Sequence, residues 1–183
     1  MKIYTFLAEG FEETEAIAVI DLLRRAEFDV VTISAADNKT VTGSHKISVI
    51  CDTAISDSDF KDGDALFFPG GVPGVPNLAK NNKILNLIKS YYNRGSYLIA
   101  LCAAPYLFDL AGILNDKNFT CFPSWREKIN TGKYCDAPVV CDGKIITGKS
   151  MGASISLGLK IIETIKGRPA AAKIADSIYF IIS

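Results

Sequence analysis

The chain of 183 residues has no net charge, one histidine and no long apolar run. Its 20 basic residues balance 20 acidic ones, which argues against binding nucleic acid or an anionic membrane through bulk positive charge. No apolar run approaches the roughly 20 residues that a membrane-spanning helix needs. At 49% hydrophobic residues the chain is too apolar for disorder. We therefore expect one soluble domain, residues 1–183, with no nucleic-acid or membrane partner.

Export and metal-binding signatures are also missing. The first apolar stretch stops at Glu9, too early for a secretory signal peptide, so we expect a cytoplasmic protein with reduced cysteines. The 5 cysteines are odd in number and show no CxxC spacing, and His45 is the single histidine. We therefore expect no metal site, and mostly buried, structural cysteines. The cysteines are Cys51, Cys102, Cys121, Cys135 and Cys141.

Strand-like and helix-like segments alternate along the chain. The expected strands are 2–7, 29–34, 64–68, 97–101, 118–121, 138–141 and 144–147, with an edge hairpin or meander over 41–49. The expected helices are 14–26, 84–91 closed by Gly95, 103–111, 151–165 and one from 169 toward 178. Apolar strands separated by helices predict an α/β fold with a mostly parallel sheet covered on both faces. Ligands of such folds bind beyond the carboxyl ends of the strands.

Cys102 is the first candidate for chemistry. It lies at a predicted strand-to-helix junction, with Ala100 and Ala104 two residues to either side. A nucleophile on such a sharp turn needs small neighbours because the backbone is crowded there. The start of a helix would also favour the thiolate through its dipole and free amides. The same spacing fits a buried structural cysteine, so the residues alone leave both interpretations open.

Three further residues follow the first and third expected strands. Glu15 could reach over the sheet edge toward Cys102, although a solvated first-turn glutamate, as expected for its neighbours Glu12 and Glu13, is the simpler interpretation. Gly70 and Gly71 would let backbone N–H groups approach a ligand or a developing oxyanion, or would form a simple turn. No phosphate-binding glycine motif is present, and we expect no cofactor.

Taken together, three segments resemble the ThiJ/PfpI family and, within it, the branch of the parkinsonism-associated deglycase. They are Gly10 to Glu15, Phe68-Pro69-Gly70-Gly71 and Ala100 to Pro105, and their order and spacing are specific. The resemblance extends along essentially the whole chain. It implies a flavodoxin-like three-layer α/β sandwich, a homodimer and a reactive cysteine on a nucleophile elbow.

The resemblance also implies roles for individual residues. Cys102 matches the reactive cysteine, and Glu15 matches a glutamate that is thought to be protonated and to donate a hydrogen bond to it. Gly71 and Ala103 match the positions whose amides form an oxyanion hole. Phe122 stands where some members have a histidine, so this segment cannot complete a Cys–His–acid triad and peptidase activity is disfavoured. His45 replaces a family arginine near the subunit interface, and its role in binding an anion stays open.

Two functions share this one site. The first is a cofactor-independent glyoxalase or deglycase in which Cys102 adds to a small reactive carbonyl such as methylglyoxal. The second is a redox-sensing, chaperone-like protein of oxidative stress, whose Cys102 is oxidised to the sulfinate without efficient turnover.

Overall fold

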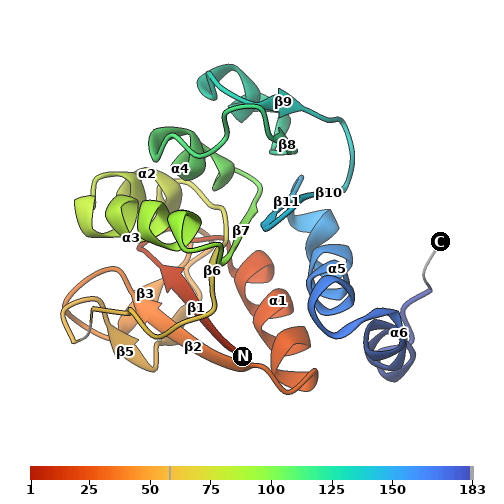
Figure 1. The fold of residues 1–183 in the computed structure, drawn as a ribbon. Helices are drawn as coiled ribbons and strands as arrows, with labels where there is room; N and C mark the ends of the chain where they lie inside the picture. Colours follow the sequence, from red (N-terminus) through yellow and green to blue (C-terminus); the bar gives the residue numbers. More distant parts are fainter. Residues whose placement is uncertain (58, 182–183) are drawn as a thin grey trace.

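A seven-stranded sheet forms the centre of the molecule, in the order β10-β11-β7-β6-β1-β2-β5. The computed structural model describes residues 1–57 and 59–181 (Figure 1). The strands are β1 (Lys2–Leu7), β2 (Asp29–Ser34), β5 (Thr53–Ala54), β6 (Ala65–Phe68), β7 (Tyr97–Leu101), β10 (Val139–Asp142) and β11 (Ile145–Gly148). Neighbouring strands run parallel, except that β10 and β11 form an antiparallel pair at one edge. The mostly parallel sheet is as predicted.

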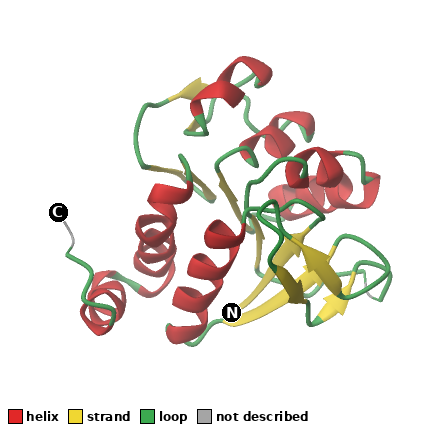
Figure 2. Ribbon diagram, turned by 180° about the vertical axis from the view of Figure 1, so that it is seen from behind, coloured by secondary structure: helices red, strands yellow, loops and turns green. Residues whose placement is uncertain are grey.

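Helices cover both faces of this sheet. Helices α2 (Gly74–Ala79), α3 (Asn82–Asn93) and α4 (Pro105–Leu110) lie on one face (Figure 1). Helices α1 (Glu13–Arg25) and α5 (Ser154–Lys166) lie on the other, and α6 (Arg168–Ser177) packs against α5, as the reverse view in Figure 2 also shows. This is the expected three-layer α/β sandwich. Within the described residues, none of these helices combines the length and the apolar character that crossing a bilayer requires.

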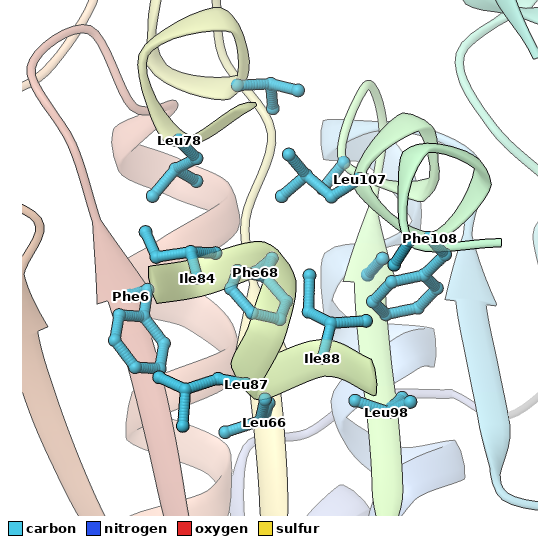
Figure 3. Packing of buried hydrophobic residues seen from close by; sticks show 14 of the residues in the cluster. Phe6, Leu66, Phe68, Leu78, Ile84, Leu87, Ile88, Leu98, Leu107 and Phe108 are labelled. Atoms are coloured by element: carbon cyan, nitrogen blue, oxygen red, sulfur yellow. The ribbon is translucent and has the colours of Figure 1, made fainter. Parts of the chain in front are cut away.

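Alternation along each strand divides the buried side chains between two apolar cores. In β6, Leu66 and Phe68 face α3 and α4, whereas Ala65 and Phe67 face α1 and α5. Figure 3 shows the first core, where strand side chains meet those of α3 and α4. Burying one such side chain contributes roughly 1.5–3 kcal/mol. The strands therefore present a rigid edge at their carboxyl ends, where the loops lie.

Several elements differ from the prediction. The hairpin over 41–49 is present as β3 (Thr40–Thr42) and β4 (Ser48–Ile50), but it forms a separate two-stranded sheet, and the main sheet ends on β5. Helix α4 starts two residues later than predicted, and the strand expected over 118–121 shortens to β8 (Asn118–Phe119), paired with β9 (Lys133–Tyr134). Two 3₁₀ helices, η1 (Pro123–Lys128) and η2 (Met151–Ala153), complete the described chain.

Candidate active site

Cys102 occupies a strained turn between β7 and α4. Its φ of +62° is a left-handed conformation that non-glycine residues rarely adopt. The Cys102 N–H donates to the Gly148 carbonyl at 2.9 Å. The Phe122 N–H donates to the Cys102 carbonyl, also at 2.9 Å. The backbone around Cys102 is therefore fixed on both sides in the manner of a nucleophile elbow.

Glu15 lies beside this elbow, on the first turn of α1. The carboxylate of Glu12 caps the helix by accepting a hydrogen bond from the Glu15 N–H at 2.6 Å. The Glu15 residue is only 1% exposed, and its Oε2 accepts a hydrogen bond from the Gly70 N–H at 2.7 Å. Its carboxyl also shares a hydrogen bond with the Cys102 thiol. Three distant segments of the sequence thus meet at the carboxyl edge of the sheet.

The turn after β6 allows this close approach only because it carries two glycines. A Cβ atom on Gly70 would lie 2.6 Å from Glu15 Oε2 and 2.7 Å from the Cβ of Cys102. Gly71 has a φ of +104°, and a Cβ there would lie 2.4 Å from the backbone nitrogen of Glu12. No larger residue fits at either position without moving the site.

The backbone amides of this region act on two different groups, the Cys102 sulfur and the Glu15 carboxyl. Those of Gly71 and Ala103 form hydrogen bonds to the Cys102 sulfur. The amide of Gly70, which we expected to be free for an oxyanion, is instead directed at Glu15. Gly70 therefore positions the glutamate.

Burial dominates the electrostatics of the pair. It raises the pKa of Glu15 from 4.5 to about 7, although the hydrogen bonds from Cys102 and Gly70 act in the opposite direction. Burial also raises the pKa of Cys102, and so does the negative charge of Glu15, against the lowering effect of the Ala103 and Gly71 amides. The thiolate-stabilising helix start that we predicted does not dominate, since α4 begins only at Pro105. Protonation of Glu15 removes the opposing charge, so the pair can hold one proton and one negative charge.

His45 and Glu13 form a separate link between the hairpin and α1. The His45 side chain is 73% exposed, as expected, and its Nδ1 lies 3.1 Å from Glu13 Oε2. The prediction that Glu13 is solvated was wrong, because the residue is buried and accepts hydrogen bonds from the N–H groups of His45 and Ile47. Glu12, Glu13 and His45 offer ligand atoms within 4.8 Å of one another. Both Glu13 oxygens are already hydrogen-bonded, so this is a structural link and not an open metal site.

The other cysteines divide into two groups. Cys51 and Cys121 are buried, as predicted, and all five cysteines are free thiols. Cys102 and Cys135 are partly exposed and Cys141 is exposed, so the expectation of mostly buried cysteines was wrong. Cys135 and Cys141 lie in or beside short strands at the sheet margin, where one face is open to solvent. Within residues 1–57 and 59–181, Cys102 is the cysteine whose pKa reflects a hydrogen bond with a carboxyl group, whereas the Asp52 charge acts on Cys51 through space.

Comparison with known proteins agrees with this architecture. The DJ-1/PfpI family model matches residues 1–164, and the chain belongs to this family. It is 31% identical to protein DJ-1 homolog B of Arabidopsis thaliana over 93% of its own length but only 39% of the plant protein. The chain thus spans well under half of that relative.

Two further relatives are similar over most of their length. The glutathione-independent glyoxalase DJR-1.2 of Caenorhabditis elegans is 32% identical over 87% of this chain and 85% of the worm protein. The solved structure of oxidized DJ-1 from Toxoplasma gondii is 27% identical, with a TM-score of 0.95 over 99% of each chain. The three-layer sandwich is therefore the fold of this family.

Proposed function

We propose that this protein is a cysteine-dependent enzyme that converts small reactive carbonyls, such as methylglyoxal, into hydroxy acids without a cofactor. The observation that carries the proposal is the pairing of the partly exposed Cys102 with the buried Glu15, with the Gly71 and Ala103 amides beside the sulfur. The glyoxalase name of the worm relative supports the same chemistry.

The geometry supplies the groups that each step needs. Glu15 takes the proton of the Cys102 thiol, the sulfur adds to the aldehyde carbon, and Glu15 returns the proton to the oxygen to give a hemithioacetal. Glu15 then removes the hydrogen from that carbon as a proton, forming an enediol, and the neighbouring carbon is protonated. This gives a thioester of lactate, which water hydrolyses to free the thiol. The aldehyde carbon is oxidised and the ketone carbon reduced, so no external oxidant is needed. The Gly71 and Ala103 amides stabilise negative charge on the oxygen.

Lactate formation from methylglyoxal tests the proposal directly. We expect activity in the wild type and its loss in Cys102→Ser, because the hydroxyl is a far weaker nucleophile at neutral pH. Cys141→Ser is the matched control, since Cys141 is an exposed thiol with no carboxyl partner shown. Equal rates in the wild type and Cys102→Ser would contradict the proposal.

A second function, redox sensing with chaperone-like protection, uses the same sulfur. Two equivalents of peroxide would convert the Cys102 thiolate to the sulfinate and release two equivalents of water or hydroxide. The Gly71 and Ala103 amides favour such an anion, and a protonated Glu15 would donate a further hydrogen bond to it. Mass spectrometry after mild peroxide should then show Cys102 oxidised before Cys141, and no effect of Glu15→Gln would exclude this function.

We further propose that the protein works as a homodimer in a reducing compartment such as the cytoplasm. Exposed apolar side chains lie on α1 (Ile17), on the hairpin loop that Glu13 holds (Ile47), on η2 (Met151) and at the start of α5 (Ile155). Helix α5 packs against α1, so these positions belong to neighbouring elements. Analytical ultracentrifugation should give twice the chain mass, and Ile17→Asp should reduce it to a monomer.

A further inference from the structure

A polar pocket of about 650 Å³ lies beside the cysteine elbow and has no part in the steps above. It is lined by Pro123, Arg126, Glu127, Tyr134, Asp136 and Lys149. These residues come from η1, from the end of β9 and from the turn that follows β11. The volume is within the range of several hundred Å³ that is typical of small-molecule sites. A three-carbon dicarbonyl compound would leave most of it empty.

The main chain of Cys102 is connected to both walls of this pocket. On one side, the Phe122 N–H donates to the Cys102 carbonyl, and Pro123 follows directly. On the other side, the Cys102 N–H donates to the Gly148 carbonyl, and Lys149 follows directly. Each wall therefore begins one residue away from a hydrogen-bond partner of the nucleophile. Both walls are thus tied to the carboxyl end of β7, where Cys102 lies.

The charged side chains in the pocket differ in whether they have an ion-pair partner. Lys149 pairs with Asp136, and the Tyr134 hydroxyl donates to the same carboxylate at 3.3 Å. The Arg126 guanidinium lies 5.0 Å from the centre of the Tyr134 ring, and it forms no ion pair within residues 1–57 and 59–181, even with the adjacent Glu127. Arg126 is therefore a cation that faces the pocket without a carboxylate partner.

The electrostatic effect of Arg126 extends toward the elbow. Burial raises the pKa of Cys121 to about 11, and the positive charge of Arg126 opposes that rise. Cys121 immediately precedes Phe122, the residue bonded to Cys102. The charge of Arg126 therefore reaches the segment that is hydrogen-bonded to Cys102.

We infer that this pocket binds a carboxylate at the non-reacting end of the carbonyl substrate, with Arg126 as its partner. An arginine–carboxylate pair can form two parallel, charge-assisted hydrogen bonds. The substrate class is then a 2-oxoaldehyde that carries an acidic side chain, and the product is a hydroxy diacid. The inference rests on the proposed carbonyl chemistry and specifies which carbonyl compounds the enzyme prefers.

Paired substrates that differ by one charge test this inference. We expect kcat/KM for 4,5-dioxopentanoate to exceed that for its methyl ester by about tenfold or more, as one charged hydrogen bond supplies. Arg126→Gln should remove most of this preference while the rate with methylglyoxal stays within about threefold. Lys128→Gln is the matched control, because Lys128 lies on the same 3₁₀ helix but does not line the pocket. Equal kcat/KM for acid and ester in the wild type would overturn the inference.

A binding measurement separates this inference from the proposed function. Calorimetry with 4-oxopentanoate, a ketone that cannot undergo the reaction, and with its methyl ester reports on the pocket without turnover. If the acid binds and Arg126→Gln weakens this binding, the pocket is supported. If methylglyoxal is then not converted, only the proposed function fails. Turnover of methylglyoxal with no selective binding of the acid contradicts the pocket alone.

Discussion

Two glutamates on the first turn of α1 are both buried, yet they sit in opposite electrostatic environments. Glu13 accepts hydrogen bonds from the His45 N–H at 2.6 Å, from the Ile47 N–H at 3.4 Å and from the Ser44 hydroxyl at 3.3 Å. Glu15 accepts one backbone hydrogen bond, from Gly70, and faces a thiol. The first is tied into the hairpin, and the second faces the elbow.

The two pKa values follow from the balance between burial and hydrogen-bond donors at each carboxyl. Burial acts to raise the pKa of Glu13, but hydrogen bonds from its own backbone, His45 and Ile47 outweigh this effect and lower it. For Glu15 burial prevails, and the pKa rises to about 7. The same helical turn therefore carries Glu13, which is ionised at neutral pH, and Glu15, whose carboxyl can exchange a proton near neutral pH. Only the second suits general acid–base chemistry.

Replacing each carboxyl by an amide should give the largest difference in rate between the Glu13 and Glu15 variants. We expect Glu15→Gln to lower the rate of methylglyoxal conversion by about 10²–10⁴-fold, because the amide cannot shuttle a proton. Glu13→Gln should leave the rate within about threefold. Steady-state lactate assays on both variants check this, and equal losses would show that the difference between the two carboxyls has no catalytic meaning.

The pH dependence of stability should differ between the same two positions. The raised pKa of Glu15 means that the folded state binds more protons than the unfolded state between pH 4.5 and about 7. Relative to Glu15→Gln, the wild type should lose about 3 kcal/mol of unfolding free energy as pH rises through this window, at about 1.4 kcal/mol per pKa unit.

Glu13 should show the opposite sign. Its lowered pKa contributes stability above the unfolded value of 4.5, and that contribution is lost as pH falls through the lower folded value. Urea unfolding of wild type, Glu13→Gln and Glu15→Gln from pH 3 to pH 8 measures both effects. A wild-type curve parallel to that of Glu15→Gln would contradict the raised pKa.

A methyl group at Gly70 should disturb Glu15 and leave Glu13 unaffected. The new Cβ would lie 2.6 Å from Glu15 Oε2, so we expect Gly70→Ala to cost about 1–3 kcal/mol in stability and at least tenfold in activity. Gly152→Ala is the matched control, because a Cβ there meets nothing within 4 Å. Thermal unfolding and lactate assays compare the two variants, and equivalent behaviour would mean that the Gly70 contact is not restrictive.

Removal of the His45 imidazole should have the smallest effect. The side chain is 73% exposed, and its backbone N–H would still donate to Glu13 in His45→Ala. We expect a loss below about 1 kcal/mol, as for exposed ion pairs, and an unchanged rate. If His45→Ala lost much of its activity while its mass in ultracentrifugation stayed unchanged, His45 would have a direct part in the reaction.

The sequence predicts the central strands of the fold better than the short elements around them. Strands 2–7, 29–34 and 97–101 have the predicted bounds because their apolar runs are continuous and bounded by helical patterns. β5 escapes prediction because two residues carry no periodicity. α2 lies where Pro73, Gly74 and Pro76 indicate a loop, yet Pro73 is its N-cap and the helix runs through Pro76.

For the site, residue patterns alone place Cys102 on a sharp turn but cannot decide whether Glu15 reaches it. That contact depends on how α1 sits over the end of β7, which is a tertiary relation, and only the family resemblance anticipates it. The burial of Glu13 carries no local signal at all, since its donors come from a hairpin more than thirty residues further along the chain. The exposure of Cys141 likewise follows from the edge position of β10.

The central claim is that Glu15 retains a proton near neutral pH beside Cys102. A site-specific ¹³C NMR titration of the Glu15 carboxyl, assigned by comparison with Glu15→Gln, measures this most directly. We predict a midpoint of about 7, well above the ordinary value of 4.5. A midpoint at or below 4.5 would contradict the shared-proton pair and, with it, the proposed chemistry.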